Sequence, residues 1–312
     1  MALKTLIIYN LTAAKGKAAK DLPHVKELLK QAGIEYELVH TNQVGDAINL
    51  AQRAAEQGYG LVVAAGGDGT VNEVVNGLMR AKVDGDIRPA LGVLPVGRGN
   101  DFAYGVGIPQ DIPAAIAVLA RQATRRIDIG HFVGGDYPDG RYFANGVGLG
   151  FDTVVGFEAA KIPWLQGAAS YLVALVKNIF LYNKPPVYEI VMDDVTLRQP
   201  FLMASIMNGR RMGGSFYMAP NGNPSDGIFD LCLAGNIPQI AILSVAVKFF
   251  SGRQGEHPLV QMTQAKRIHV RAIEGSIPAH GDGETICTAG QELMIELHAS
   301  ALDVVTQSGE PA

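Results

Sequence analysis

The segment of residues 62–70 constrains the fold of this chain more than any other. The short apolar run Val62-Val63-Ala64-Ala65 is typical of a strand, and it ends in the turn Gly66-Gly67-Asp68-Gly69-Thr70. A strand–turn–helix joint directs backbone N–H groups and the positive end of a helix toward one point, where a phosphate binds well. A helix is predicted because the next apolar residues have the i, i+3, i+4, i+7 spacing of one helix face: Val71, Val74, Val75 and Leu78.

The turn also carries a carboxylate, Asp68. A carboxylate beside phosphates is favourable mainly when a divalent cation lies between them, so the turn predicts a site for a nucleoside triphosphate and magnesium. It is not a P-loop, because no Lys-Ser/Thr pair follows the last glycine, and it lacks the G-x-G-x-x-G pattern of dinucleotide sites. Taken alone, the turn is also compatible with a purely structural role in an α/β sheet.

Composition excludes several classes of protein. A chain of 312 residues suggests about two domains. The net charge of −4 provides no basic field for a nucleic-acid partner. Cys232 and Cys287 are expected to be buried thiols in a reducing compartment, without a disulfide framework. The N-terminus lacks a signal-peptide pattern, and no apolar run reaches the ~18 residues of a membrane span, so we expect a cytoplasmic protein.

The first part of the chain alternates between strand and helix patterns. This alternation predicts a mostly parallel sheet with helices on both faces, and ligands of such sheets bind at the carboxyl ends of the strands. Asn10, Thr41, the 66–70 turn and the 97–101 loop all follow predicted strands, so they are expected at one edge. The predicted strands are 6–9, 36–40, 60–65 and 91–94, and the predicted helices are 18–32, 47–57 and 112–121.

Beyond Arg125 the pattern changes to short alternating runs separated by Gly, Asn and Pro. Such runs predict an antiparallel β-sandwich or a flattened barrel. We expect a hairpin at 130–139 and two domains, 1–129 with a C-terminal return of 300–312, and 130–299. The predicted strands are 142–151, 187–192, 201–207, 229–233, 268–272 and 293–297, and the predicted helices are 166–182 and 238–250.

Three further loops combine glycine with polar groups. In residues 94–103, Arg98 can neutralise phosphate, whereas Asn100 or Asp101 could equally be a helix N-cap. Residues 219–230 and 278–284 each contain an Asp-Gly pair, which by itself indicates only a tight turn. Glu284 follows the second pair and is a candidate general base for a hydroxyl nucleophile.

Taken together in order, five segments closely resemble the bacterial soluble diacylglycerol kinase and lipid kinase family: GGDGT, LPVGRGNDFA, NGVGLGFD, APNGNPSDGIFD and HGDGE. The resemblance covers nearly the whole chain. It implies a phosphofructokinase-like α/β domain that binds ATP, followed by an antiparallel β-sandwich domain for the lipid substrate. It also implies that the last strand, 302–306, returns to the first domain.

The resemblance implies roles for particular residues. Glu284 is the implied base, Asp68 serves the catalytic Mg²⁺, and Asp101 is linked through water to Asp226 and Glu284. A structural Mg²⁺ is implied at the Asp226 side chain, with main-chain oxygens of Asn223 and Ile228. The implied nucleotide contacts are Asn10, Thr41, Gly66, Gly67, Asp68, Gly69, Thr70, Val71, Asn72, Gly97 and Arg98.

Two positions depart from the family pattern. The usual Asn-Pro-x-Ser-Gly turn is here Asn10-Leu11-Thr12-Ala13-Ala14, which lacks one phosphate-facing hydroxyl unless Thr12 or Lys15 replaces it. Arg98 stands where the family usually has Thr. A guanidinium can still bind phosphate.

The activity implied is transfer of the ATP γ-phosphoryl group to a lipid hydroxyl, with diacylglycerol as the first candidate. An NAD kinase-like enzyme shares GGDGT and the two-domain plan, but the LPVGRGNDFA loop, the apolar 163–182 segment and GDGE argue against it. A phosphofructokinase-type sugar kinase would need basic contacts to a sugar phosphate that the sequence does not supply. A nucleotide- or lipid-binding protein that has lost catalysis is the remaining alternative.

The expected partner is a lipid at the membrane surface, and the resemblance leaves a homodimer open. The apolar helix near 168–182 is by default a core helix. It is alternatively a lid that contacts the bilayer through aromatic and basic residues. Its predicted stripe is Tyr171, Leu172, Leu175, Ile179 and Tyr182, with Trp164, Lys161, Lys177 and Lys184 at the interface.

Overall fold

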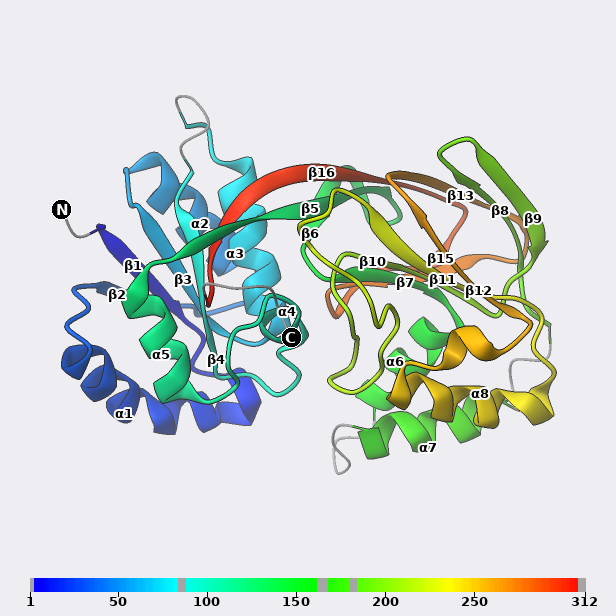
Figure 1. Cartoon of the computed structure of the whole chain (residues 1–312), viewed down its shortest axis with the longest axis horizontal. Helices are drawn as coiled ribbons and strands as arrows, with labels where there is room; N and C mark the ends of the chain where they lie inside the picture. The colour runs from blue at the N-terminus through cyan, green and yellow to red at the C-terminus, as the bar shows by residue number, and fades with distance from the viewer. Residues whose placement is uncertain (1–2, 84–87, 162–167, 180–183, 308–312) are drawn as a thin grey trace. The chain divides into compact units, whose positions relative to one another are not determined.

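The computed structural model describes residues 3–83, 88–161, 168–179 and 184–307, and the side chains of 160 and 168–172 are not among what it describes. The chain divides into two compact units. Unit 1 is Met1–Ile129 with Ala299–Ala312, and unit 2 is Gly130–His298. Figure 1 traces the chain through both. Among the described helices, none is both long enough and apolar enough to span a membrane.

Unit 1 contains a parallel sheet with the strand order β2-β1-β3-β4-β16. Helices α1 and α5 pack together, as do α2 and α3, and the two pairs lie on opposite faces of the sheet (Figure 1). The elements are β1 (Thr5–Tyr9), η1 (Ala13–Gly16), α1 (Lys17–Gln31), β2 (Glu37–His40), α2 (Asp46–Glu56), β3 (Leu61–Gly66), α3 (Asp68–Arg80), β4 (Ala90–Pro95), α4 (Asp101–Gly105) and α5 (Ile112–Arg121).

The core of unit 1 explains why its strands are so apolar. Every residue of β1, β3 and β4 is buried, as expected for parallel strands covered on both faces. The helix predicted after the glycine-rich turn is confirmed. Its residues Thr70 to Leu78 are all buried, so the predicted apolar stripe lies in a stretch of the helix that is buried on every face.

Unit 2 is an antiparallel β-sandwich, which confirms the predicted fold class. One sheet has the order β16-β13-β8-β9 and the other β12-β11-β10-β7-β14-β15. Apolar side chains of both sheets form one core between them. The strands are β5 (Thr124–Gly134), β6 (Tyr137–Phe143), β7 (Gly146–Gly150), β8 (Val187–Met192), β9 (Val195–Pro200), β10 (Met203–Met207), β11 (Phe229–Ala234), β12 (Val260–Ala265), β13 (Arg267–Glu274), β14 (Ile277–Gly281), β15 (Glu284–Gly290) and β16 (Glu292–Val305).

Helices cover the outer face of the second sheet and form a second core with it. They are α6 (Phe151–Ala160), α7 (Ala168–Ile179) and α8 (Gln239–Ser251), followed by η2 (Gln254–Glu256). The prediction of one strand over 142–151 is wrong at this point. The chain leaves β6 at Phe143, starts β7 at Gly146, and enters α6 after Gly150, whose φ of +89° only glycine adopts readily.

The two predicted C-terminal strands, 293–297 and 302–306, are one long strand, β16. β16 pairs with β13 over Glu292–Glu296 and later runs parallel to β4, where Val304 lies opposite Leu91. The predicted return of the C-terminal strand to the first α/β sheet is therefore confirmed. An irregularity at Ser300 (φ +50°) separates the two parts, and its N–H donates to Asp128 Oδ1 at 2.7 Å.

The predicted stripe on the 166–182 helix is only partly correct. Ala174, which is not part of the predicted stripe, is fully buried, and Ile179 is buried as predicted. Val173 and Val176 are exposed at 45% and 44%. Trp164 and Tyr182 lie outside the described residues, as do the side chains of Tyr171 and Leu172.

Candidate active site

The carboxyl ends of four strands of unit 1 lie along one edge of the sheet and are joined by backbone hydrogen bonds. The N–H of Asn10, just after β1, donates to Ala65 O at 2.9 Å. The N–H of Thr41, just after β2, donates to Tyr9 O at 3.2 Å. The N–H of Gly97, after β4, donates to Gly66 O at 3.0 Å. The predicted convergence of these four segments is therefore observed.

The glycine-rich turn ends β3 at Gly66 and begins α3 at Asp68. The first helical hydrogen bond runs from Val71 N to Gly67 O, so the N–H groups of the preceding turn have no acceptor within the helix. Backbone N–H groups and the positive end of a helix, arranged in this way, can bind an anion. Gly97 approaches so closely that a Cβ on it would lie 2.3 Å from the Cα of Gly67, which requires glycine there.

Asn10 connects two parts of this edge through its side-chain amide. Its Nδ2 donates to Thr70 Oγ1 at 3.0 Å. Its Oδ1 accepts from the backbone N–H and the hydroxyl of Thr12, at 3.0 and 2.7 Å. The Thr12 hydroxyl proton is thus directed at Asn10, so this hydroxyl orients the amide instead of donating to a phosphate.

Asp68 links the turn to the following loop. Its Oδ1 accepts a hydrogen bond from the backbone N–H of Phe102 at 3.0 Å, in the first turn of α4. The N-cap residue of α4 is Asn100, in a left-handed conformation and without a side-chain cap bond. Its Nδ2 instead donates to Gln110 Oε1 at 3.1 Å. Asn100 is therefore the N-cap residue, one of the two positions that the sequence offered, but the side chain that accepts from the first turn of the helix is Asp68. Asp101 is a buried residue at the helix start.

The remaining predicted nucleotide residues differ in accessibility. Arg98 is exposed at the tip of its turn. Val71 and Asn72 are buried within α3, where Asn76 Nδ2 donates to Asn72 O at 2.9 Å. Any contact from Val71 or Asn72 to a nucleotide would therefore come from the backbone.

In unit 2, the loop before β11 holds the three predicted metal-ligating residues. The Asp226 N–H donates to Asn223 O at 3.4 Å, and Asp226 Oδ1 accepts from Ile228 N–H at 3.2 Å. The nearby Asp230 has its pKa raised by burial and then by the charge of Asp226. A carboxylate and main-chain carbonyls in a negative environment are the oxygen ligands that Mg²⁺ prefers, so the donor set fits the metal.

Glu284 begins β15 on the far side of a two-residue hairpin turn. Gly281 and Glu284 pair across it, and Asp282 and Gly283 both have positive φ, +48° and +85°, as a type I′ turn requires. Glu284 itself is half-buried.

Asp282 is an important residue to which the sequence assigned no role. Its buried carboxylate accepts hydrogen bonds from the N–H groups of Ala144, Asn145 and Gly146, at 2.7, 3.0 and 2.9 Å. These bonds explain the break between β6 and β7. They also fix the hairpin that carries Glu284. The only sequence signal for this role was the Asp of HGDGE, and in sequence this Asp looks the same as an ordinary turn residue.

A second set that the sequence missed lies beneath the helices of unit 2. Ser205 and His280 lie opposite Gly148 on the two strands that flank it. Asp152 Oδ2 lies 3.7 Å from His280 Nε2. Both carboxylate oxygens of Asp152 and the Ser205 hydroxyl are buried without a hydrogen-bond partner in the described part of the chain. Such groups are strongly unfavourable unless a polar ligand or water binds them.

Comparison with known proteins agrees with this geometry. The diacylglycerol kinase catalytic domain family matches residues 4–132, and the YegS C-terminal NAD kinase beta sandwich-like domain matches residues 145–306. The diacylglycerol kinase of Bacillus subtilis (strain 168) is 33% identical over 280 residues, covering 89% of this chain and 88% of that protein. This chain belongs to the diacylglycerol kinase family. The family predicted from the five ordered motifs is thereby confirmed, and the chain is a lipid kinase.

Other members of the family are equally extensive matches. The diacylglycerol kinase of Staphylococcus saprophyticus is 32% identical, covering 91% of this chain and 90% of that protein. A crystal structure of a diacylglycerol kinase from Bacillus anthracis str. Sterne has a TM-score of 0.73 at 23% identity, covering 98% of this chain and 97% of that one. Yeast NADH kinase complexed with NADH has a TM-score of 0.51 at 11% identity, covering 99% of this chain and 84% of that one, which shows a shared fold alone.

Proposed function

We propose that this diacylglycerol kinase family member transfers the γ-phosphoryl group of ATP to the free hydroxyl of diacylglycerol, forming phosphatidic acid. The observation that carries the proposal is the glycine-rich turn at the start of α3, on the sheet edge formed by four strand ends. The names of the relatives support diacylglycerol as the acceptor. Phosphoryl transfer depends mainly on positioning and charge neutralisation, which such a site supplies.

The nucleotide is held at the edge of unit 1. Backbone N–H groups of the 66–70 turn bind the phosphates, and the Arg98 guanidinium adds positive charge from the neighbouring turn. Asn10 positions Thr70, and Thr41 borders the same edge. Asp68 is the proposed ligand of a catalytic Mg²⁺, which would neutralise charge on the phosphates when bound.

Glu284 is the proposed general base. Its carboxylate takes the proton from the acceptor hydroxyl as the oxygen attacks the γ-phosphorus, and ADP leaves with the electrons of the broken bond. The proposed structural Mg²⁺ site consists of the Asp226 carboxylate and the main-chain oxygens of Asn223 and Ile228.

The buried polar set of unit 2 is the proposed recognition site for the polar part of the acceptor. Asp152 and Ser205 present acceptor and donor groups that have no hydrogen-bond partner among the described residues, and His280 lies 3.7 Å from Asp152. A hydroxyl or an ester carbonyl would satisfy them. Aliphatic acyl chains would contact the apolar cluster of α6, α7 and α8.

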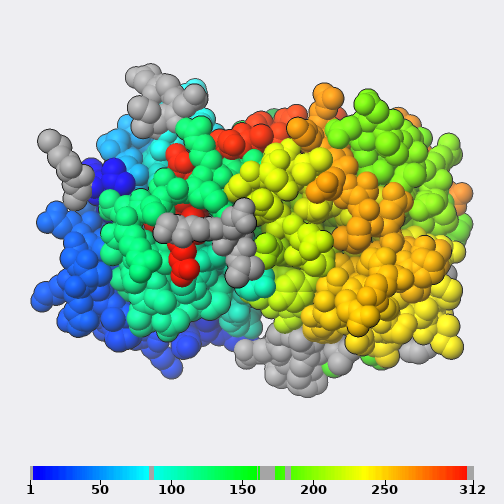
Figure 2. Space-filling model, in the orientation of Figure 1, coloured from blue at the N-terminus to red at the C-terminus, as the bar shows by residue number. Residues whose placement is uncertain are grey.

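Peripheral contact with the membrane surface is proposed through α8. Its exposed apolar residues recur at i, i+3, i+7 and i+10, which is one helix face: Ile240, Leu243, Val247 and Phe250, with exposures of 94%, 43%, 60% and 39%. Figure 2 shows this segment in gold at the surface. Lys161 and Lys177, which the sequence placed at the membrane interface, both pair with Glu158. We therefore expect apolar insertion to contribute more than charge.

The test is incorporation of labelled γ-phosphate into defined acceptors by the purified protein. Diacylglycerol in mixed micelles, ceramide, NAD and fructose 6-phosphate are presented separately with ATP and Mg²⁺, and Glu284→Gln is the matched control. Label in diacylglycerol that depends on Glu284 supports the proposal. Label in NAD alone would instead support the NAD kinase alternative, and no transfer to any acceptor would support a binding protein.

A further inference from the structure

We propose a zinc site on unit 2, formed by His131, Glu296 and His298. His131 lies on β5, and the other two residues lie on β16, two positions apart, so they point to the same face of that strand. β5 pairs with β16. Two adjacent strands thus present two imidazoles and one carboxylate to one point.

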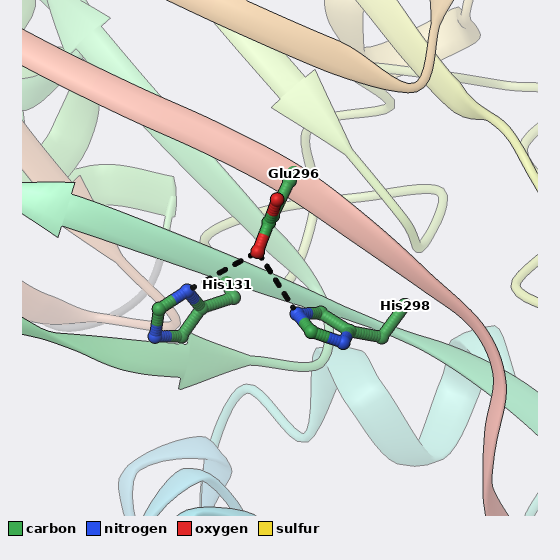
Figure 3. A group of neighbouring side chains, drawn as sticks. All are labelled: His131, Glu296 and His298. Atoms are coloured by element: carbon green, nitrogen blue, oxygen red, sulfur yellow. Dashed lines mark ion pairs between the residues drawn. The ribbon is translucent and has the colours of Figure 1, made fainter.

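The distances suit a small cation. His131 Nδ1 lies 3.9 Å from Glu296 Oε1, and His298 Nε2 lies 3.4 Å from the same oxygen. The three ligand atoms all lie within 4.8 Å of one another. Figure 3 shows one nitrogen of each ring directed at Glu296. Donor atoms of a tetrahedral zinc ion lie roughly 3.3 Å apart, so a small rotation of the exposed glutamate completes the geometry.

Packing holds the two rings in position before any ion binds. The Tyr142 ring lies tilted against the His131 ring, with centroids 4.7 Å apart, and meets His298 edge-on at 5.8 Å. Gly140 leaves space for the His131 ring, because a Cβ there would lie 2.3 Å from its Nε2. His131 therefore keeps Nδ1, and not Nε2, toward Glu296.

A second observation points to a ligand at this place. The Nε2 atom of His298 is buried, yet it has no hydrogen-bond partner among the described residues. A buried imidazole nitrogen in this state is unsatisfied unless it binds a metal ion or shares a proton with the carboxylate. Two histidines and one carboxylate favour Zn²⁺ over Mg²⁺, because imidazole is a preferred ligand of zinc. The Glu296 side chain is 56% exposed, which leaves the fourth position to water.

The site lies on the two strands that carry the chain into and out of unit 2. Zinc bound there would join β5 to β16 through side chains, in addition to their backbone pairing. Binding is therefore expected to raise the thermal midpoint of unfolding. Zinc binding at these three residues requires neither ATP, nor lipid, nor the proposed catalytic residues.

The test is calorimetric titration of the full-length protein with Zn²⁺ in millimolar Mg²⁺, without nucleotide or lipid. We expect one zinc per chain and at least ~10-fold weaker binding for His131→Ala, His298→Ala and Glu296→Gln. His269→Ala is the matched control. His269 pairs with Glu292 (2.6 Å) on the same sheet, but the pair is not part of a three-ligand group among the described residues. The zinc affinity of this variant should equal that of the wild type.

X-ray absorption should show two imidazole ligands on the bound zinc. Circular dichroism of each variant, with His298→Gln as a milder substitution, separates loss of binding from loss of fold. If the three ligand variants bind zinc as tightly as the wild type, or if the wild type binds none, the site does not exist.

Discussion

The carboxylate of Asp68 accepts a hydrogen bond from the backbone N–H of Phe102, with Oδ1 and N separated by 3.0 Å. The bond joins the first residue of α3 to the first turn of α4, so the loops that follow β3 and β4 are coupled by one side chain. Asp68 consequently has two proposed tasks, positioning the 97–101 loop and binding a metal. Substitutions can separate them.

Asp68→Asn keeps a side-chain oxygen that can accept from Phe102 but removes the negative charge. We expect a nearly unchanged thermal midpoint together with a large loss of ATP-dependent turnover. Asp68→Ala removes both, and the lost cap should destabilise the protein by about 1 kcal/mol. Thermal unfolding and kinase assays on both variants measure the two effects. Equal activity of Asp68→Asn and wild type would contradict the metal role.

Asp282 and Glu284 lie two residues apart in one hairpin but should respond in opposite ways. Asp282→Ala leaves three buried N–H groups without an acceptor, and we expect a loss of at least ~3 kcal/mol in the free energy of unfolding. Glu284→Gln should unfold like the wild type but lose ~10²–10⁴-fold in kcat. Denaturant titration paired with kinetics distinguishes them. A stable, active Asp282→Ala protein would refute the structural assignment.

Asp152→Asn tests the buried polar set of unit 2. The Asn side chain has the shape of the Asp side chain and can still donate a hydrogen bond to water or accept one from it. The fold should therefore persist. If Asp152 accepts a hydrogen bond from the lipid, KM for diacylglycerol should rise about 10-fold while KM for ATP stays constant, in line with the loss of one charge-assisted hydrogen bond. Parallel changes in both constants would indicate a general effect on the structure instead.

The exposed face of α8 predicts how the protein meets a bilayer. Replacing Ile240 and Val247 together by Ser should reduce cosedimentation with lipid vesicles and raise the apparent KM for vesicle-borne diacylglycerol. Activity on a short-chain diacylglycerol dissolved as monomer should remain. Val195→Ser, at an exposed valine on β9, is the control and should bind vesicles normally. Normal vesicle binding by the double variant would remove α8 from the interface.

Because its thiol is buried, we expect Cys232 to lower the free energy of unfolding at high pH. Burial, with a smaller contribution from Asp152, raises the pKa of this thiol to about 12 from its ordinary 9.0. The folded protein therefore keeps the proton at pH values where the unfolded chain releases it. This contribution to stability is complete below pH 9.0 and declines as the pH rises toward about 12.

The measurement is denaturant unfolding between pH 8 and 10.5 on wild type and Cys232→Ala. The free energy of unfolding of the wild type should fall more steeply with pH. Native Cys232 should also resist a thiol reagent that labels it after unfolding. Rapid labelling of the native protein would show that the thiol is accessible.

The sequence by itself determined those features that local physics dictates. The helix 112–121 was predicted with its observed bounds, because Asp111 caps it at Ala114 N (3.1 Å) and its apolar residues follow the helix period. The glycine-rich turn, the strand alternation of unit 1 and the hairpin before Glu284 depend on neighbours within a few residues. The family followed from five such segments in order.

Only the tertiary structure decided the contacts between distant residues. Asp282 reads as a plain turn residue until the fold brings it to Ala144, 138 residues away. Asp68 reaches Phe102 across 34 residues, and His131 meets Glu296 and His298 from another strand. The residues around a side chain do not specify which distant backbone N–H groups lack a hydrogen-bond acceptor. Those unpaired groups are known only once the fold has brought both segments together.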